Sequence, residues 1–129
     1  MRLILVRHAE AAPGDPDELR PLTAAGRETA RALGEQLSAA EPDAVVSSPS
    51  LRARETAEQI ARAAGVEAEA DERLGPGATV EDVRAVVEGR GGTAVVVGHQ
   101  PDCSEIMLAL TGRDVSFAPG ASAEVELSD

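Results

Sequence analysis

The sequence predicts an α/β fold, a three-layer α/β/α sandwich around a mainly parallel central sheet. Three short and nearly continuous apolar runs, 2–6, 44–47 and 93–98, have the composition of strands that are covered on both faces. Stretches with helical spacing of apolar residues separate these runs, so that strand and helix alternate along the chain. Such alternation produces right-handed crossovers, which bury a parallel sheet between two helical layers.

The size and composition are those of one globular domain. A chain of 129 residues with 43% hydrophobic and 27% charged residues suits a single domain spanning 1–129. Phe117 is the only aromatic residue, so the core must be built from aliphatic side chains, which bury less area each. We therefore expect a modest stability.

Turn and capping signals define the elements of the first third of the chain. The strand at 2–6 leads into a stretch rich in Pro, Gly and Asp, 11–18, which predicts a surface loop. Thr23 is the expected N-cap of the first helix. Apolar residues on this helix recur at steps of three and four, at Ala30, Leu33, Leu37 and Ala40.

The second helix has a start signal and a stop signal. Ser48 is the expected N-cap, with Pro49 in the first helical position, and Gly65 is the expected stop. The positions predicted to face inward are Ala53, Ala57, Ile60, Ala61 and Ala64. Residues 66–70 alternate between apolar and acidic side chains, which predicts an edge strand.

The last third repeats the pattern of helix and strand. Thr79 is expected to open a shorter helix, and Asp102 with Glu105 resembles a capping box for a helix that ends at Gly112. The apolar positions of the shorter helix are Val83, Val86 and Val87. The alternating stretch 122–127 predicts a terminal strand.

Charge and composition restrict the partners. The formal net charge of −11 opposes binding to nucleic acid or to an anionic membrane, and base stacking has almost no aromatic platform. No apolar run is long enough to span a membrane, and the first one reaches Arg7 too soon for a signal peptide, so we expect a cytoplasmic protein. Cys103 is the only cysteine, and we interpret it as a small core residue.

Both histidines directly follow predicted strands. His8 comes after the first strand and its adjoining Arg7, and His99 comes after the strand at 93–98. In open α/β sheets, ligands bind at the carboxyl ends of the strands, so the two imidazoles meet there if their strands are neighbours. The alternative is a structural role, in which each ring forms a hydrogen bond with a loop carbonyl.

Arginines near these histidines predict a site for an anion. Arg7 precedes His8, and Arg52 lies in the first turn of the second helix, where backbone N–H groups also attract anions. The planar guanidinium suits phosphate. Arg20 is a further candidate, although a loop arginine is by default simply solvated. We expect no metal, because the histidines and carboxylates lack a metal-ligand spacing and the arginines would repel a cation.

Four motifs, taken together, resemble a known family. They are "RHAE" at 7–10, "RPLTAAGRETA" at 20–30, "SSPSLRARETAEQIA" at 47–61 and "VVVGHQPDCSEI" at 95–106. In this order they resemble the histidine phosphatase superfamily, which has a phosphoglycerate mutase-like fold, and most closely its short SixA-type phosphohistidine phosphatases. The resemblance extends from residue 1 to about residue 112.

The resemblance implies a role for each candidate residue and no cofactor. His8 would be the nucleophile, phosphorylated transiently on a ring nitrogen. The residues that would bind the phosphoryl group are Arg7, Arg20, Arg52 and His99. Arg52 takes this role instead of Arg54 because it directly precedes alanine in the family's pattern, and Arg54 is then expected at the surface. Arginines and an imidazole donor can stabilise the charge of a transferring phosphoryl group without magnesium.

The general acid is where this chain departs from larger relatives. They carry a carboxylate on an inserted segment, whereas the corresponding region here, 72–82, is short. Glu10 and Glu81 are the remaining candidates; Glu72 and Asp82 also lie in this part of the sequence, and Glu81 and Asp82 are explained as charges at a helix N-terminus. A weak acid favours phosphohistidine as substrate, because an imidazole leaves far more readily than an alkoxide.

The resulting hypothesis is a metal-independent phosphatase that acts on phosphohistidine in a protein through a phosphohistidine intermediate. The alternative enzyme is a small-molecule phosphomonoesterase for a sugar phosphate or similar ester, with Glu10 or Glu81 as acid. A third hypothesis is a phosphate-binding module without turnover, against which the two histidines argue. The expected partner is a phosphorylated protein or a small phosphorylated substrate, and we expect a monomer.

Overall fold

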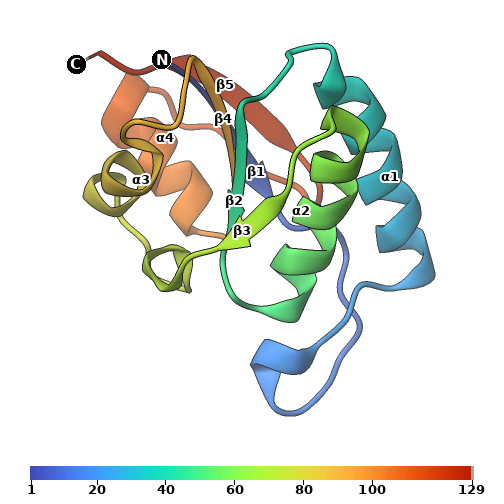
Figure 1. The fold of residues 1–129 in the computed structure, drawn as a ribbon. Coiled ribbons are helices and arrows are strands. Elements are labelled where there is room, and N and C mark those ends of the chain that lie inside the picture. Colours follow the sequence, from blue (N-terminus) through green and yellow to red (C-terminus); the bar gives the residue numbers. More distant parts are fainter. Residues whose placement is uncertain (129) are drawn as a thin grey trace.

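A five-stranded sheet lies between two layers of helices in the computed structural model, which describes residues 1–128 (Figure 1). The strands are β1 (Arg2–Arg7), β2 (Ala44–Ser47), β3 (Ala68–Ala70), β4 (Thr93–Gly98) and β5 (Ser122–Glu126). Their order is β3-β2-β4-β1-β5, and only β5 pairs in antiparallel direction, with β1. The predicted sandwich with a mainly parallel sheet is confirmed.

The helices form two pairs on opposite faces of this sheet. The pair α1 (Ala24–Ser38) and α2 (Leu51–Ala64) covers one face, and α3 (Val80–Val87) and α4 (Asp102–Thr111) cover the other (Figure 1). Short 3-10 turns are η1 (Asp17–Leu19) and η2 (Glu72–Leu74). None of the helices within residues 1–128 has the length and apolar character that a membrane span requires.

Alternation along the central strands divides the core into two clusters. On β1, Ile4 and Val6 pack with the apolar residues of α1 and α2, whereas Leu3 and Leu5 pack with those of α3 and α4. Successive strand residues point to opposite faces, so a continuous apolar run is what a sheet covered on both sides requires. Packing on both faces of the sheet holds β1 and β4 in place. His8 and His99 directly follow the ends of these two strands.

Several predicted helix boundaries are confirmed. The hydroxyl of Thr23 accepts a hydrogen bond from the backbone of Gly26, and Thr79 forms a reciprocal capping box with Asp82. The predicted stops are glycines with left-handed backbone, Gly65 after α2 and Gly112 after α4. The predicted edge strand is confirmed as β3, although it is shorter than 66–70.

Two predicted N-caps are wrong, because their side chains contact residues outside the helix instead of its first turn. The helix α2 begins after Ser50, and Ser48 instead contacts His99. The carboxylate of Asp102 accepts a hydrogen bond from the backbone of Gly77 at 2.8 Å, while Pro101 holds the N-cap position of α4. A short polar side chain before a helix is a capping signal only when nothing outside the helix competes for it.

Gly26 allows the first turn of α1 to contact the backbone that follows His8. A Cβ atom at this position would overlap the carbonyl oxygen of Glu10, whose backbone also accepts a hydrogen bond from Thr23. We expect Gly26→Ala to lower the free energy of unfolding by about 1–3 kcal/mol, since backbone must shift to relieve the overlap. Urea denaturation measures this quantity. Gly92→Ala is the control, because the nearest atom to its Cβ lies 3.8 Å away, and equal losses in both variants would contradict the explanation.

Candidate active site

The two histidines meet because β1 and β4 are neighbours in the sheet. Arg7 lies opposite Gly98 in the parallel register, and the backbone N–H of His8 donates to the carbonyl of Gly98 at 3.0 Å. The imidazole centroids of His8 and His99 are 5.4 Å apart, the ring planes meet at 63°, and both rings are buried. The condition that the sequence left open, adjacency of the two strands, is therefore met.

The backbone determines which nitrogen of His8 carries the proton. Nδ1 lies 2.7 Å from the carbonyl oxygen of Ala9, and because that oxygen can only accept, Nδ1 carries the hydrogen. In the neutral ring, Nε2 then holds the lone pair. Burial lowers the pKa of His8, the bond with Ala9 opposes this, and the charges of Arg52, Arg7 and Arg20 lower it further. The ring is thus neutral at neutral pH, with the lone pair of Nε2 available.

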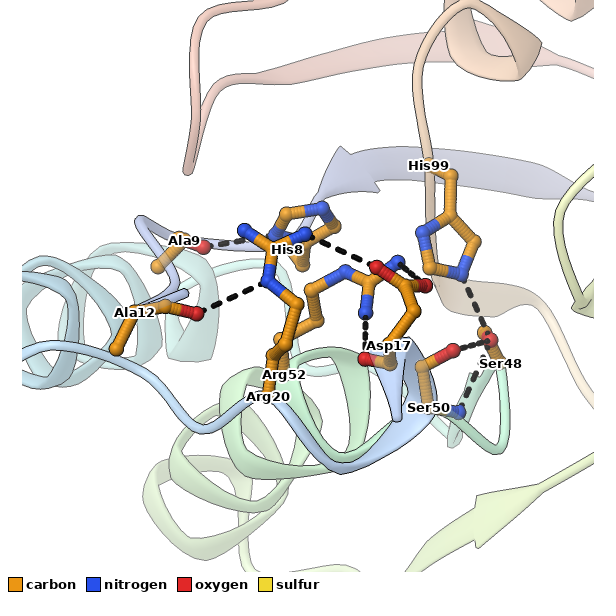
Figure 2. A network of polar contacts seen from close by, with 9 residues as sticks. All are labelled: His8, Ala9, Ala12, Asp17, Arg20, Ser48, Ser50, Arg52 and His99. Atoms are coloured by element: carbon orange, nitrogen blue, oxygen red, sulfur yellow. Dashed lines mark hydrogen bonds and ion pairs between the residues drawn. The ribbon is translucent and has the colours of Figure 1, made fainter. Parts of the chain in front are cut away.

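Ser48 orients the second imidazole. Its hydroxyl oxygen lies 2.8 Å from Nε2 of His99 and also accepts a hydrogen bond from the backbone of Ser50 at 3.2 Å. The hydroxyl proton has two acceptors, Nε2 of His99 at 2.8 Å and the hydroxyl of Ser50 at 3.3 Å. The shorter contact favours Nε2, which leaves the ring proton on Nδ1, the nitrogen on the side of His8 and Asp17 (Figure 2). Burial, with the charge of Arg52 next, lowers the pKa of His99 to about 4. A neutral ring with Nδ1–H can donate to an anion.

Three guanidinium groups surround the imidazoles, and a backbone carbonyl orients each of them. The pairs are Arg7 Nη1 with Phe117, Arg20 Nε with Ala12, and Arg52 Nη1 with Asp17, each at 2.9 Å. A neutral acceptor fixes the direction of a guanidinium group without cancelling its charge. We call the group formed by His8, His99 and these three arginines the cationic cluster.

Arg7 has a buried donor that no protein atom satisfies. Its Nε is the one buried side-chain nitrogen or oxygen without a hydrogen-bond partner within residues 1–128. Arg7 also contributes to the lowered pKa values of both histidines, which places its charge beside them. A buried N–H without a hydrogen-bond partner is costly.

Asp17 also lies at this site, although it was not among the candidates predicted from the sequence. Its carboxylate accepts hydrogen bonds from Arg20 and Arg52, both at 3.1 Å (Figure 2). The composition of 11–18 indicated only a loop, and residues 13–19 are indeed exposed. A spacing of three residues between Asp17 and Arg20 was the one available signal for the pair.

The other sequence candidates lie elsewhere or serve the fold. Of the four carboxylates considered as a general acid, none forms a hydrogen bond with either histidine within residues 1–128: Glu10 contacts Thr23, Asp82 caps α3, Glu72 opens η2 and Glu81 lies in the first turn of α3.

Arg54 is exposed and donates to the carbonyl of Pro49, so its predicted surface position is confirmed. Cys103 is fully buried, as expected, and burial raises the pKa of its thiol to about 12. Residues 1–128 hold no group of three His, Cys, Asp or Glu side chains suited to a metal.

Two imidazoles and three arginines at the carboxyl ends of parallel strands define an enzyme of phosphoryl-group chemistry. Residues 3–75, more than half of the chain, match the histidine phosphatase superfamily (branch 1). The chain belongs to this superfamily and is a phosphatase with its phosphoglycerate mutase-like fold. The family resemblance seen in the sequence is thereby confirmed.

Solved structures give the same result over nearly the whole chain. The protein histidine phosphatase SixA complexed with tungstate is 28% identical, with a TM-score of 0.87 over 98% of this chain and 88% of the other. A protein from Agrobacterium tumefaciens described as a candidate phosphohistidine phosphatase SixA is 25% identical, with a TM-score of 0.81 over 95% and 89%. One so described from Nakamurella multipartitia is 30% identical, with a TM-score of 0.73 over 95% and 82%. Among curated proteins no match was found.

Proposed function

We propose that this phosphatase is a SixA-type protein phosphohistidine phosphatase, which works without a metal ion through a phosphohistidine intermediate. The observation that carries the proposal is the position of His8, a neutral imidazole with its Nε2 lone pair available beside His99 and three arginines. Similarity to three structures described as SixA, at 25–30% identity over nearly the whole chain, supports the substrate class.

In the first step, Nε2 of His8 attacks the phosphorus atom of a phosphohistidine whose distal ring nitrogen is protonated. The bond from phosphorus to Nε2 forms, the bond to the substrate nitrogen breaks, and the substrate leaves as neutral imidazole. Nδ1 of His8 keeps its proton and stays hydrogen-bonded to the carbonyl oxygen of Ala9, so the phosphorylated ring is a cation. The guanidinium groups and Nδ1–H of His99 stabilise the equatorial oxygens.

In the second step, water attacks the same phosphorus atom. The bond to Nε2 of His8 breaks, the ring returns to its neutral form, and both protons of the water leave with the phosphate. Charge and atoms balance in both steps without a separate general acid, because the leaving ring is already protonated each time. An alkyl ester lacks this advantage, since its alkoxide needs a proton from the enzyme.

We therefore expect the enzyme to hydrolyse a phosphohistidine peptide at least about 10²-fold faster than an alkyl phosphate monoester, the usual contribution of a general acid. Phosphate release from both substrates, measured as kcat/KM with and without EDTA, tests this. An aryl phosphate with a good leaving group is the matched control and should fall between the two. Faster turnover of the alkyl ester would contradict the proposal and favour a small-molecule phosphomonoesterase.

A further inference from the structure

The carboxylate of Asp17 bridges two arginines of the cationic cluster. Oδ1 accepts from Nη1 of Arg20 and Oδ2 accepts from Nη2 of Arg52, each at 3.1 Å (Figure 2). These two hydrogen bonds keep the pKa of Asp17 below its usual value, so the carboxylate is ionised at neutral pH. Two oxygens of a phosphoryl group would bind the same two nitrogen atoms in the same way.

The backbone of Asp17 and its side chain have separable roles. The backbone carbonyl orients Arg52 through Nη1, and the carbonyl of Ala12 orients Arg20 through Nε. Neither contact involves the carboxylate. The guanidinium groups thus keep their directions if the carboxylate turns away or loses its charge, and the nitrogen atoms that it contacts become available to another anion.

The exposure of Asp17 indicates where a displaced carboxylate goes. Its side chain is 61% exposed, whereas that of Arg52 is 7% exposed and both imidazoles are buried. Attacking and leaving atoms lie in line at phosphorus, so a leaving group opposite the buried His8 faces the solvent. From its exposed position beside Arg20 and Arg52, a displaced Asp17 carboxylate would remain near such a leaving group.

We propose that Asp17 determines the specificity of this site: its carboxylate occupies the phosphoryl-oxygen positions on Arg20 and Arg52, is displaced from them by a substrate, and then favours a substrate whose ring is positively charged while it is still bonded to phosphorus. This inference rests on the proposed function. A phosphoryl group displaces the carboxylate because it carries more charge and has a third oxygen for Arg7 and His99. The protonated ring of phosphohistidine gains a partner in the displaced carboxylate, and the uncharged organic group of an ester does not.

The charge on Asp17 has two opposite effects, and a structural role would not produce both. Removing it makes the arginines available, so inorganic phosphate binds more tightly to the variant. Removing it also takes away the partner of the protonated ring of phosphohistidine, so this substrate loses its advantage over an aryl phosphate, whose aryl group is uncharged. For a partly exposed charge we expect each effect to be about fivefold.

The test compares Asp17→Asn with Glu18→Gln, which removes the same charge one residue along the same exposed turn. Calorimetry measures the Kd of inorganic phosphate, and kcat/KM is measured for a phosphohistidine peptide and for p-nitrophenyl phosphate. In Asp17→Asn, the Kd should fall about fivefold, and the ratio of peptide to aryl-ester kcat/KM should fall by a similar factor. Glu18→Gln should leave both quantities unchanged.

The inference is overturned if either quantity changes as little in Asp17→Asn as in Glu18→Gln while the wild-type protein binds phosphate and hydrolyses the peptide. A wild-type protein that does neither would instead overturn the proposed function, so the two failures are distinguishable. Thermal melting of both variants monitors the fold, which should be unaffected because the backbone contacts of Asp17 and Ala12 remain.

Discussion

His8→Ala is expected to form no phosphoenzyme and to hydrolyse a phosphohistidine peptide more than about 10³-fold more slowly than wild type. The substitution removes Nε2. Because Nδ1 donates its hydrogen to the carbonyl of Ala9, Nε2 is the ring nitrogen whose lone pair is available. Arginines alone can bind a phosphoryl group, but they cannot accept it covalently. Rapid quenching in alkali, which preserves phosphohistidine, followed by mass spectrometry of the digest measures the label.

His99→Gln is the matched control for this experiment. Glutamine keeps a donor near the phosphoryl group but cannot form a stable phosphoenzyme, so label should still appear on the peptide that contains His8, at a reduced rate. Label on His99 of the wild-type protein, or on any residue of His8→Ala, would contradict the assignment of the nucleophile. The 5.4 Å between the ring centroids makes this distinction necessary, because a phosphoryl group bound there lies near both rings.

Arg52→Ala is expected to lower kcat/KM for the phosphohistidine peptide by about 10²- to 10³-fold, the usual cost of removing one charged donor from a buried site. The side chain of Arg52 is 7% exposed, and its Nη2 is one of the two nitrogen atoms that the carboxylate of Asp17 contacts. Arg54→Ala is the matched control on the same helix. Its side chain is exposed, and within residues 1–128 its one side-chain hydrogen bond goes to the carbonyl of Pro49, so the kcat/KM of this variant should stay within about twofold of wild type.

Arg52→Lys separates charge from geometry. Lysine keeps the positive charge but loses the planar fork that contacts the backbone and an anion at once, so most of the loss should remain. Steady-state kinetics and thermal melting measured on all three arginine variants distinguish a site defect from unfolding. Equal kcat/KM values for Arg52→Ala and Arg54→Ala, with both proteins folded, would exclude Arg52 from phosphoryl binding.

The fold was predictable from sequence because its signals are local. A run such as 93–98 is too short and too rich in valine for anything but a buried strand, and Thr23, Thr79, Gly65 and Gly112 act on their own helices. Strand order is different, since it depends on packing between segments far apart in the chain. The meeting of His8 and His99 could therefore be stated only as a condition.

The parts of the site that the sequence did not reveal depend on contacts across the fold. Ser48 lies three residues before the first residue of α2, yet its hydroxyl orients His99, which is 51 positions away. Asp102 resembles a cap, yet its carboxylate holds the backbone at Gly77. Asp17 lies in a stretch whose composition indicates only a turn, and its contact with Arg52 exists only because η1 folds against α2. No local pattern encodes such pairs.

Main-chain carbonyl oxygens orient the guanidinium groups of this enzyme, and this restricts which sequence changes the site tolerates. Any amino acid supplies a carbonyl, so the positions of Ala12 and Phe117 are open to replacement without loss of the bonds to Arg20 and Arg7. Lengthening or shortening either loop would instead misdirect an arginine, even with every side chain of the site intact. Divergence at these two places should therefore occur by exchange of residues and not by insertion or deletion.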